Sequence, residues 1–250
     1  MTRNAALGFG DVAASYADLR PSYPRELFEF LDARLQGPRR VAVDLGAGPC
    51  KASFDLAALF QKVTAVEADR RMLDAAPADR RIERINCAAE DADFDAGSVD
   101  CVIAATSFHW MQQDIVCANV AKWLRPGGVF FPFLYGPFSV IGPAEAVFAK
   151  HWALWAPFMD KRLGAKANYS PAMKACGAFG RLDTFSMTME KKLPPEKAAG
   201  LFLTASYARA YMTAKGLRED YLHALAGELS AFGEIAVSFP LGGVLGVKSD

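Results

Sequence analysis

A short segment, residues 41–51, constrains the fold of this chain more than any other. Its first part, Val41–Leu45, has the apolar character of a buried strand, and Gly46 and Gly48 then make a turn before a helix start. The next apolar strand ends in Glu67. A strand, a glycine turn that lets a ligand approach the backbone, and an acid that closes the following strand are typical of a nucleoside-binding unit. The acid suits a ribose, because one carboxylate can accept hydrogen bonds from two hydroxyls.

The composition narrows the class of protein. The chain has 250 residues, of which 52% are hydrophobic and 22% charged, as in a globular domain. Lys+Arg and Asp+Glu are both 28, so there is no broad positive field and we expect no nucleic-acid partner. The chain shows no signal-peptide pattern, and no apolar window approaches the roughly 18 residues of a membrane span. We therefore expect a cytoplasmic protein, monomeric or homodimeric, with no membrane partner.

The cysteines and the other metal-binding residue types give no sign of a cross-linked or metal-bound fold. The five cysteines are odd in number and form no CxxC pair, which favours free thiols in a reducing compartment. No His/Cys/Asp cluster has ligand spacing, so we expect no metal site.

The first half of the chain alternates strands with helices, which indicates a parallel sheet. We expect strands at residues 41–45, 63–67, 82–87, 99–105 and 129–134, and helices at residues 26–35, 51–60, 70–76 and 115–124. The pattern then changes. Residues 136–180 are rich in aromatics, Gly and Pro, and we expect a strand at 184–193, helices at 195–212 and 217–232, and a final β-rich run at 235–247 that is broken by Pro240 and Gly242-Gly243.

Six motifs in order give the chain its resemblance to a known family. They are the loop Asp44-Leu45-Gly46-Ala47-Gly48-Pro49-Cys50-Lys51, the acid Glu67, the turn Cys87-Ala88-Ala89-Glu90, the segment Ser107-Phe108-His109-Trp110, the turn Leu124-Arg125-Pro126-Gly127-Gly128, and the late segment Thr204-Ala205-Ser206-Tyr207. The opening Tyr16–Pro24 is similar to an amino-terminal cap. On these residues the chain resembles class I S-adenosylmethionine-dependent methyltransferases, in the type-11 small-molecule group that includes trans-aconitate methyltransferase.

The resemblance implies a fold and a division of the chain. We expect an α/β, doubly wound, Rossmann-like sheet of seven strands, with a helical insertion after strand five and one antiparallel strand from the last hairpin. We expect a single domain, with an amino-terminal cap at residues 1–36, a cofactor-binding core at 37–135, and substrate-covering insertions at 136–180 and 194–232.

The resemblance also implies S-adenosylmethionine as the cofactor and a set of residues to bind it. In this set Glu67 takes the ribose hydroxyls, and Asp44 holds the ammonium group or caps the loop. Tyr16 or Arg20 closes over the carboxylate, with a surface ion pair the alternative for Arg20. Gly46 and Gly48 let backbone N–H groups approach the methionine part. Met72 is expected against adenine, with core packing the alternative. Ala89 and Glu90 are expected at the adenine edge, although Glu90 suits a solvated loop acid as well. The expected cofactor-binding residues are Tyr16, Arg20, Asp44, Gly46, Ala47, Gly48, Glu67, Ala68, Met72, Ala89, Glu90, Thr106 and Phe108.

Methyl transfer is an in-line displacement at an already activated sulfonium carbon, so the protein mainly orients the nucleophile and excludes water. A carboxylate acceptor needs no general base, whereas a phenol, alcohol or amine benefits from one. We predict His109 and Tyr207 as catalytic, with loop packing the alternative for His109. The predicted substrate-binding residues are Trp110, His151, Trp155 and Ser206, with core packing the alternative for His151. A basic rim of Lys161, Arg162 and Lys166 would suit an acidic acceptor, with ordinary solvated side chains the alternative.

One position departs from the family pattern, because Cys50 stands where the loop has its third glycine. A tolerated substitution is one interpretation; weakened cofactor binding, an oxidation-sensitive site and lost catalysis are the others. The sequence therefore predicts methyl transfer to a small molecule, most plausibly at oxygen and possibly at a carboxylate. N- or C-methylation and a cofactor-binding protein without turnover are the alternatives. A dinucleotide oxidoreductase is disfavoured, because the loop lacks the usual dinucleotide spacing.

Overall fold

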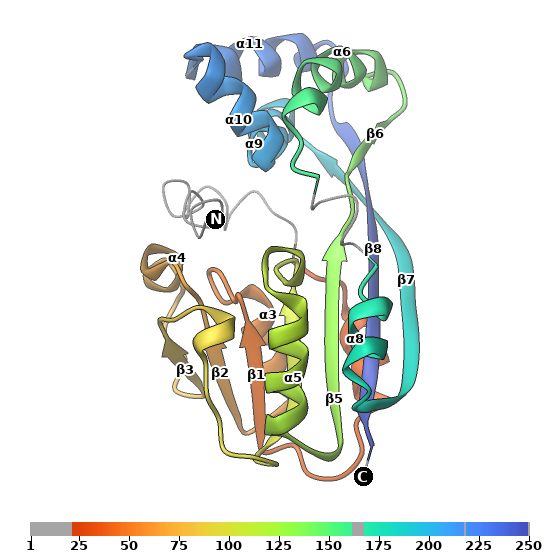
Figure 1. Ribbon diagram of the computed structural model, residues 1–250. Helices are drawn as coiled ribbons and strands as arrows, with labels where there is room; N and C mark the ends of the chain where they lie inside the picture. Colours follow the sequence, from red (N-terminus) through yellow and green to blue (C-terminus); the bar gives the residue numbers. More distant parts are fainter. Residues whose placement is uncertain (1–21, 162–167, 218, 250) are drawn as a thin grey trace.

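The computed structural model describes residues 22–161, 168–217 and 219–249. Figure 1 shows an α/β body that carries a separate group of helices above the edge of its sheet. Two long strands, β7 (Phe179–Leu193) and β8 (Ile235–Lys248), run from the body up to these helices.

The body is built on a parallel sheet. Its parallel strands are β1 (Val41–Leu45), β2 (Lys62–Val66), β3 (Ile82–Ile85), β4 (Val99–Ala105) and β5 (Leu124–Tyr135). Within the described residues the strand order is β3-β2-β1-β4-β5-β8-β6, and β7 pairs with the outer side of β8. β8 is antiparallel to both β5 and β7. The predicted doubly wound α/β fold, with a reversed strand in the last hairpin, is confirmed.

The sheet differs from the expected seven strands by one short addition. β6 (Ser139–Ile141) pairs with residues 236–238 of β8, beyond the point where β5 ends. The described chain therefore forms an eight-stranded sheet. The addition follows from the length of β8, whose first residues would otherwise have unpaired backbone groups along one edge.

Helices cover both faces of the sheet, because successive strand residues point to opposite sides. Ala42 belongs to the buried cluster that includes residues of α2 (Arg25–Asp32) and α3 (Lys51–Leu59), whereas Val43 belongs to the cluster that includes residues of α5 (Gln113–Trp123) and α8 (Ser170–Cys176). The remaining short helices of the body follow strands β2, β3 and β4. They are α4 (Arg70–Asp74), η2 (Ala89–Asp91) and η3 (Phe108–Trp110).

The upper helices come from two separate stretches of the chain. The chain after β6 supplies α6 (Glu145–Trp155) and η4 (Ala156–Phe158), and the chain between β7 and β8 supplies α9 (Pro195–Leu203), α10 (Ser206–Lys215) and α11 (Glu219–Ser230). Stacked Phe138 and Phe202, with centroids 5.2 Å apart, join the two stretches in one aromatic core. The single helix expected at 195–212 is instead two helices, because Ala205 has an extended backbone.

The expected break in the last β-rich run is absent, and β8 is continuous. Pro240, which lacks an N–H, falls between the residues of β8 that pair with β6 and those that pair with β5. Gly243 pairs with Phe133, and a Cβ there would lie 2.6 Å from the Phe133 Cβ. Both residues therefore fit the strand and do not interrupt it.

Among the described residues, no helix combines the length and the apolar character needed to cross a membrane.

Candidate functional site

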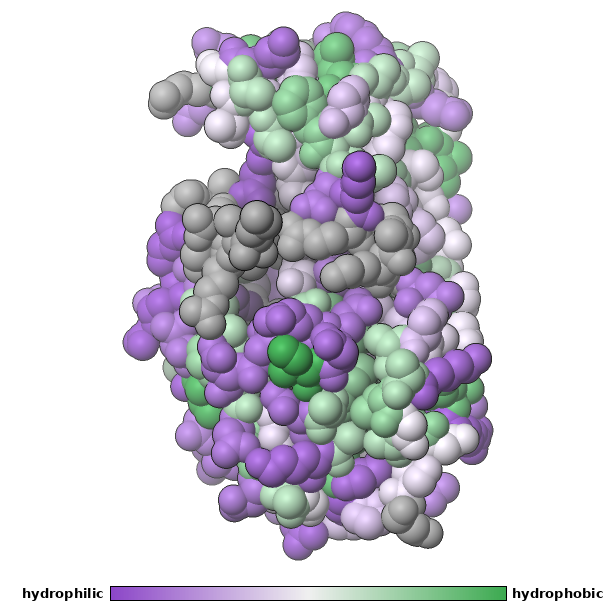
Figure 2. All heavy atoms as spheres, viewed as in Figure 1, coloured by the Kyte–Doolittle hydropathy of each residue, from purple (hydrophilic) through white to green (hydrophobic). Residues whose placement is uncertain are grey.

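A cleft of about 1800 Å³ lies where the parallel strands end, between the sheet and the upper helices. Figure 2 shows the surface hollowed between the lower and upper parts of the molecule. Open parallel sheets bind ligands at this carboxyl edge. Since single small-molecule sites occupy roughly 300–1000 Å³, the cleft has room for two ligands together.

The glycine turn after β1 forms one wall of the cleft. Gly46 and Gly48 have φ values of +66° and +55°, a region that favours glycine. Gly46 also needs its missing side chain, because a Cβ would lie 2.5 Å from the Cβ of Ser107. The predicted turn is present, and two of its backbone donors are paired within the protein. The N–H groups of Gly46 and Ala47 donate to the Val66 carbonyl at 2.8 and 3.0 Å, so the glycines serve geometry and close packing.

Glu67 directly follows β2 and lines the cleft together with the glycine turn. Its Oε2 accepts from the Gly48 N–H and its Oε1 from the Asp69 N–H, both at 2.9 Å. Burial raises the pKa of this carboxyl, and the backbone donors of Asp69 and Gly48 oppose that rise. Each carboxylate oxygen has more than one acceptor site, so both can also accept from a ligand hydroxyl.

Asp44 lies beneath the glycine turn and not on the cleft surface. It is 0% exposed, and its Oδ2 accepts from the Ser53 hydroxyl at 2.6 Å. Its Oδ1 is buried and has no hydrogen-bond partner. Burial raises the pKa of Asp44 to about 7, the Ser53 hydrogen bond lowers it, and nearby Glu67 adds to the rise. The structure thus places an unsatisfied acceptor under the loop, where a cationic group would satisfy it.

Four more predicted residues line the same cleft: Ala68, Met72, Ala89 and Glu90. The Met72 methyl lies against the turn, 3.3 Å from where a Gly48 Cβ would be. Glu90 is a connecting residue, because its Oε1 accepts from the Gln112 N–H at 2.7 Å. It therefore holds the loop after β3 against the loop after β4.

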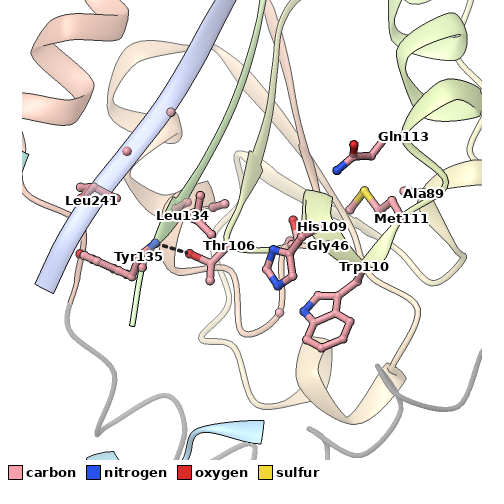
Figure 3. A pocket seen from close by; sticks show the side chains of 18 of the residues that line it. Gly46, Ala89, Thr106, His109, Trp110, Met111, Gln113, Leu134, Tyr135 and Leu241 are labelled. Atoms are coloured by element: carbon pink, nitrogen blue, oxygen red, sulfur yellow. Dashed lines mark hydrogen bonds between the residues drawn. The ribbon is translucent and has the colours of Figure 1, made fainter. Parts of the chain in front are cut away.

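Thr106 ends β4 in a conformation that β-branched residues rarely adopt, with φ of +56°. Its Oγ1 lies 2.8 Å from the Tyr23 hydroxyl and 3.4 Å from the Tyr135 N–H, the contact dashed in Figure 3. Tyr23 and Tyr135 stack with centroids 5.0 Å apart, and the Tyr135 hydroxyl donates to the Ser22 carbonyl. Residues just before α2 are thereby fixed at the ends of β4 and β5, and the amino-terminal cap at residues 1–36 stays a prediction.

His109 and Trp110 extend from η3 into the cleft, and Figure 3 shows their rings beside each other. Their centroids are 4.8 Å apart. Phe108, expected to bind the cofactor, does not line the cleft. It is fully buried and packs edge-on against Phe130, in the buried cluster that includes residues of α5. Successive residues of a tight 3-10 turn face different directions, so the segment divides between the cleft and the core.

The upper helices supply Ser206 and Tyr207 to the cleft, as predicted. His151 and Trp155 do not line it, which corrects the substrate assignment. His151 Nδ1 lies 2.6 Å from the Tyr221 hydroxyl, and the Trp155 indole N–H donates to the same oxygen. These three side chains form a polar contact inside the helical group, consistent with the core alternative for His151.

Several cleft residues were missed, and some predicted ones cannot be placed. The carboxyl-edge rule, applied to the residues that follow β4 and β5, would have found the cleft-lining Met111, Gln112, Gln113, Tyr135 and Phe138. Tyr16, Arg20, Arg162 and Lys166 lie outside the described residues. The one described member of the basic rim, Lys161, is exposed and does not line the cleft.

Cys50 is buried and has φ of +60°, the left-handed region that suits the family glycine. Burial, assisted by nearby Asp44, raises the pKa of its thiol to about 11. At neutral pH the group is a thiol and not the reactive thiolate, so the structure gives no support to an oxidation-sensitive site.

Comparison with known proteins agrees with this geometry. A family model described as a methyltransferase domain (Methyltransf_11) matches residues 43–131, from β1 into β5. Residues 43–131 thus match a methyltransferase domain, and the chain is similar to class I S-adenosylmethionine-dependent methyltransferases. The predicted resemblance and cofactor class are therefore confirmed, whereas the particular likeness to trans-aconitate methyltransferase stays a prediction.

Curated members of this family match part of the chain. A Dictyostelium discoideum protein named as a methyltransferase is 31% identical over 60% of this chain and 60% of its own length. The Saccharomyces cerevisiae protein CRG1, named as an S-adenosylmethionine-dependent methyltransferase, is 31% identical over 54% and 49%. The chain thus spans about half to three-fifths of the curated relatives that it matches.

Solved methyltransferases share the fold over most of the chain. A structure from Anaeromyxobacter dehalogenans, assigned as a type II methyltransferase, has a TM-score of 0.74 at 28% identity and covers 90% of this chain and 97% of its own. Phosphoethanolamine N-methyltransferase 2 of Haemonchus contortus, in complex with S-adenosyl-L-methionine, has a TM-score of 0.56 at 16% identity and covers 98% of this chain and 60% of its own. The second likeness shows the fold alone.

Proposed function

We propose that this protein binds S-adenosylmethionine along the carboxyl ends of β1, β2 and β3 and transfers its methyl group to an oxygen of a small molecule. The observation that carries the proposal is the meeting of the glycine turn and Glu67 in one cleft, joined by the hydrogen bond from the Gly48 N–H. The volume of about 1800 Å³ leaves room for an acceptor beside the cofactor.

The residues present fit the cofactor. The Glu67 carboxylate is positioned to accept from both ribose hydroxyls, and Met72 and Ala89 offer apolar contacts for adenine. The unpartnered Oδ1 of Asp44 suits the ammonium group, directly or through one water. The cofactor would supply a sulfonium methyl group, which is already activated for displacement.

The part left to this chain is orientation and exclusion of water. Trp110, Tyr135 and Tyr207 line the cleft with large side chains. Figure 1 shows α6, α9, α10 and α11 above the α/β body. We propose that these helices, in the two predicted insertions, cover the acceptor during transfer. The side chains that these helices bring to the cleft then determine which small molecule fits.

Transfer of a labelled methyl group tests the proposal. The purified chain, methyl-labelled S-adenosylmethionine and a small-molecule metabolite extract should give a labelled product that separates from protein, and mass spectrometry should place the methyl on oxygen. Glu67→Ala should give none at a cofactor concentration that saturates the wild type. Cofactor binding without any labelled product would instead favour a binding protein without turnover, and a methyl on nitrogen or carbon would overturn the choice of oxygen.

A further inference from the structure

A buried tyrosine from the insertion after β5 contacts the cleft histidine. The Tyr169 hydroxyl lies 3.4 Å from Nδ1 of His109. Tyr169 is 0% exposed, and its ring packs edge-on against Phe108, with centroids 5.1 Å apart. His109 is 2% exposed and lines the cleft. The sequence singled out His109 but gave no sign of a partner 60 positions later.

The direction of this hydrogen bond follows from the cost of an unsatisfied hydroxyl. Within the described chain, Nδ1 of His109 is the one hydrogen-bond partner of the Tyr169 hydroxyl. Burial raises the pKa of this tyrosine, so its oxygen keeps its proton at neutral pH. A buried O–H that donates to nothing has lost the hydrogen bond that water would give it, which is unfavourable. The hydroxyl therefore donates to Nδ1, and Nδ1 is the acceptor.

The tautomer of the imidazole is then determined. A neutral imidazole has one protonated nitrogen and one acceptor nitrogen. Since Nδ1 accepts, the proton is on Nε2. We infer that Tyr169 is a positioning residue that holds His109 as the Nε2–H tautomer, so that the cleft presents a hydrogen-bond donor to an oxygen of the methyl acceptor.

This inference rests on the proposed function and deepens it, because it favours one class of acceptor. A general base needs an acceptor nitrogen at the cleft, whereas an Nε2–H donor pairs with an oxygen that already carries lone pairs. A carboxylate meets that condition. One carboxylate oxygen accepts from Nε2–H, and the other supplies the electron pair of the new C–O bond while the C–S bond breaks onto sulfur. The negative carboxylate and the positive sulfonium become a neutral ester and a neutral thioether, and no proton moves.

Nuclear magnetic resonance of histidine nitrogens tests the tautomer without any need for turnover. The chain has three histidines, so 15N-histidine-labelled protein gives few signals, and His109→Gln assigns that of His109. At neutral pH we expect His109 to show a protonated Nε2 and an unprotonated Nδ1, with or without S-adenosylhomocysteine. Tyr169→Phe should convert His109 to a tautomer mixture or to the Nδ1–H form and leave His151 unchanged. A wild-type Nδ1–H tautomer would overturn the inference even if the variant failed to fold.

The second His–Tyr pair provides a matched control. His151 Nδ1 lies 2.6 Å from the Tyr221 hydroxyl in the upper helices, outside the cleft. Tyr221→Phe should therefore change the His151 signals and leave those of His109 unchanged. If both tyrosine variants altered both histidines, the effect would be general loosening and the positioning role would be rejected.

Kinetics on the acceptor identified by label transfer separates a donor from a base. His109→Gln keeps an N–H donor near the position of Nε2, whereas His109→Ala removes it. We expect His109→Ala to lower kcat/KM by roughly 10–100-fold, as for loss of one hydrogen bond to a charged group, and His109→Gln to recover most of that loss. Equal loss in both variants would indicate a base and overturn the inference. If the expected tautomer were observed but S-adenosylhomocysteine did not bind, the proposed function would be wrong. The inference about the tautomer would stand.

Discussion

The Gly48 N–H donates to Oε2 of Glu67 at 2.9 Å, which joins the glycine turn after β1 to the acid after β2. The Asp69 N–H holds the other carboxylate oxygen at the same distance. The two sequence signals that indicate a nucleoside site are therefore parts of one hydrogen-bonded unit. Because its acceptor atoms are already positioned, little side-chain entropy remains to be lost when a ribose binds.

Replacement of Cys50 by glycine should keep or tighten cofactor binding. Cys50 has φ of +60°, where a side chain costs roughly 1–2 kcal/mol and glycine does not. Loss of the buried thiol offsets part of this gain, so thermal stability should change little. Calorimetric titration with S-adenosylmethionine checks the prediction. Cys50→Ala, which keeps the Cβ without the sulfur, is the control, and loss of binding in the glycine variant would show that the thiol has a positive role.

Thr106 should tolerate serine better than valine. Both replacements are small, but Thr106→Ser keeps the hydroxyl that Tyr23 contacts and removes the β-branch at positive φ. Thr106→Val keeps the branch and loses the hydrogen bond. We expect urea denaturation to show Thr106→Ser within about 0.5 kcal/mol of the wild type and Thr106→Val about 1–2 kcal/mol less stable. Equal stability of the two variants would mean that the Tyr23 contact does not hold the segment before α2.

Asp44 should make the free energy of unfolding depend on pH. Burial raises the pKa of Asp44 to about 7 in the folded protein, against about 3.9 in an unfolded chain. The folded state therefore binds this proton more tightly. The resulting stability is fully present below about pH 4 and is lost as the pH rises through 7.

Asp44→Asn removes this titration and keeps an acceptor for the Ser53 hydroxyl. Relative to the variant, the wild type should lose a few kcal/mol between pH 4 and 8, since each unit of pKa shift corresponds to about 1.4 kcal/mol. Urea denaturation of both proteins at several pH values checks this. Asp55 and the other acids are common to both proteins, so their titration cancels in the comparison. Parallel pH curves would mean that the pKa of Asp44 is not raised in the folded state, and would contradict the prediction.

Local sequence determined the parallel half of the sheet well. Val41–Leu45 and Val99–Ala105 were placed with correct ends, because each apolar run is bounded by turn residues. The continuous β8 was missed, because Pro240 and Gly243 are acceptable only through pairing with β5 and β6. That pairing joins residues about 100 positions apart and leaves no local pattern.

The residues of the site also differ in how well local sequence predicts their positions. Glu67 and the glycine turn have fixed positions relative to their strands, so sequence spacing locates them in the cleft. Asp44 belongs to the glycine-turn motif and Phe108 to the segment that holds His109 and Trp110, but both are buried, since neighbouring residues of a strand or tight turn face opposite sides. His151 and Trp155 share a helix whose aromatic residues suit a core or a pocket equally well. Their contact with Tyr221, which lies in α11, decides for the core.

The most direct test of the account is calorimetric titration of S-adenosylhomocysteine into the wild type, Glu67→Gln, Glu67→Ala and a control, Glu83→Gln. Glu83 is on the neighbouring strand β3, half-exposed and paired with Lys62 outside the cleft. The account predicts saturable binding to one site in the wild type and the control. It predicts affinity roughly 10–100-fold weaker for Glu67→Gln and weaker still for Glu67→Ala, because two ribose hydrogen bonds to a charged group are lost. No binding heat for the wild type, or equal affinities for all four proteins, would contradict it.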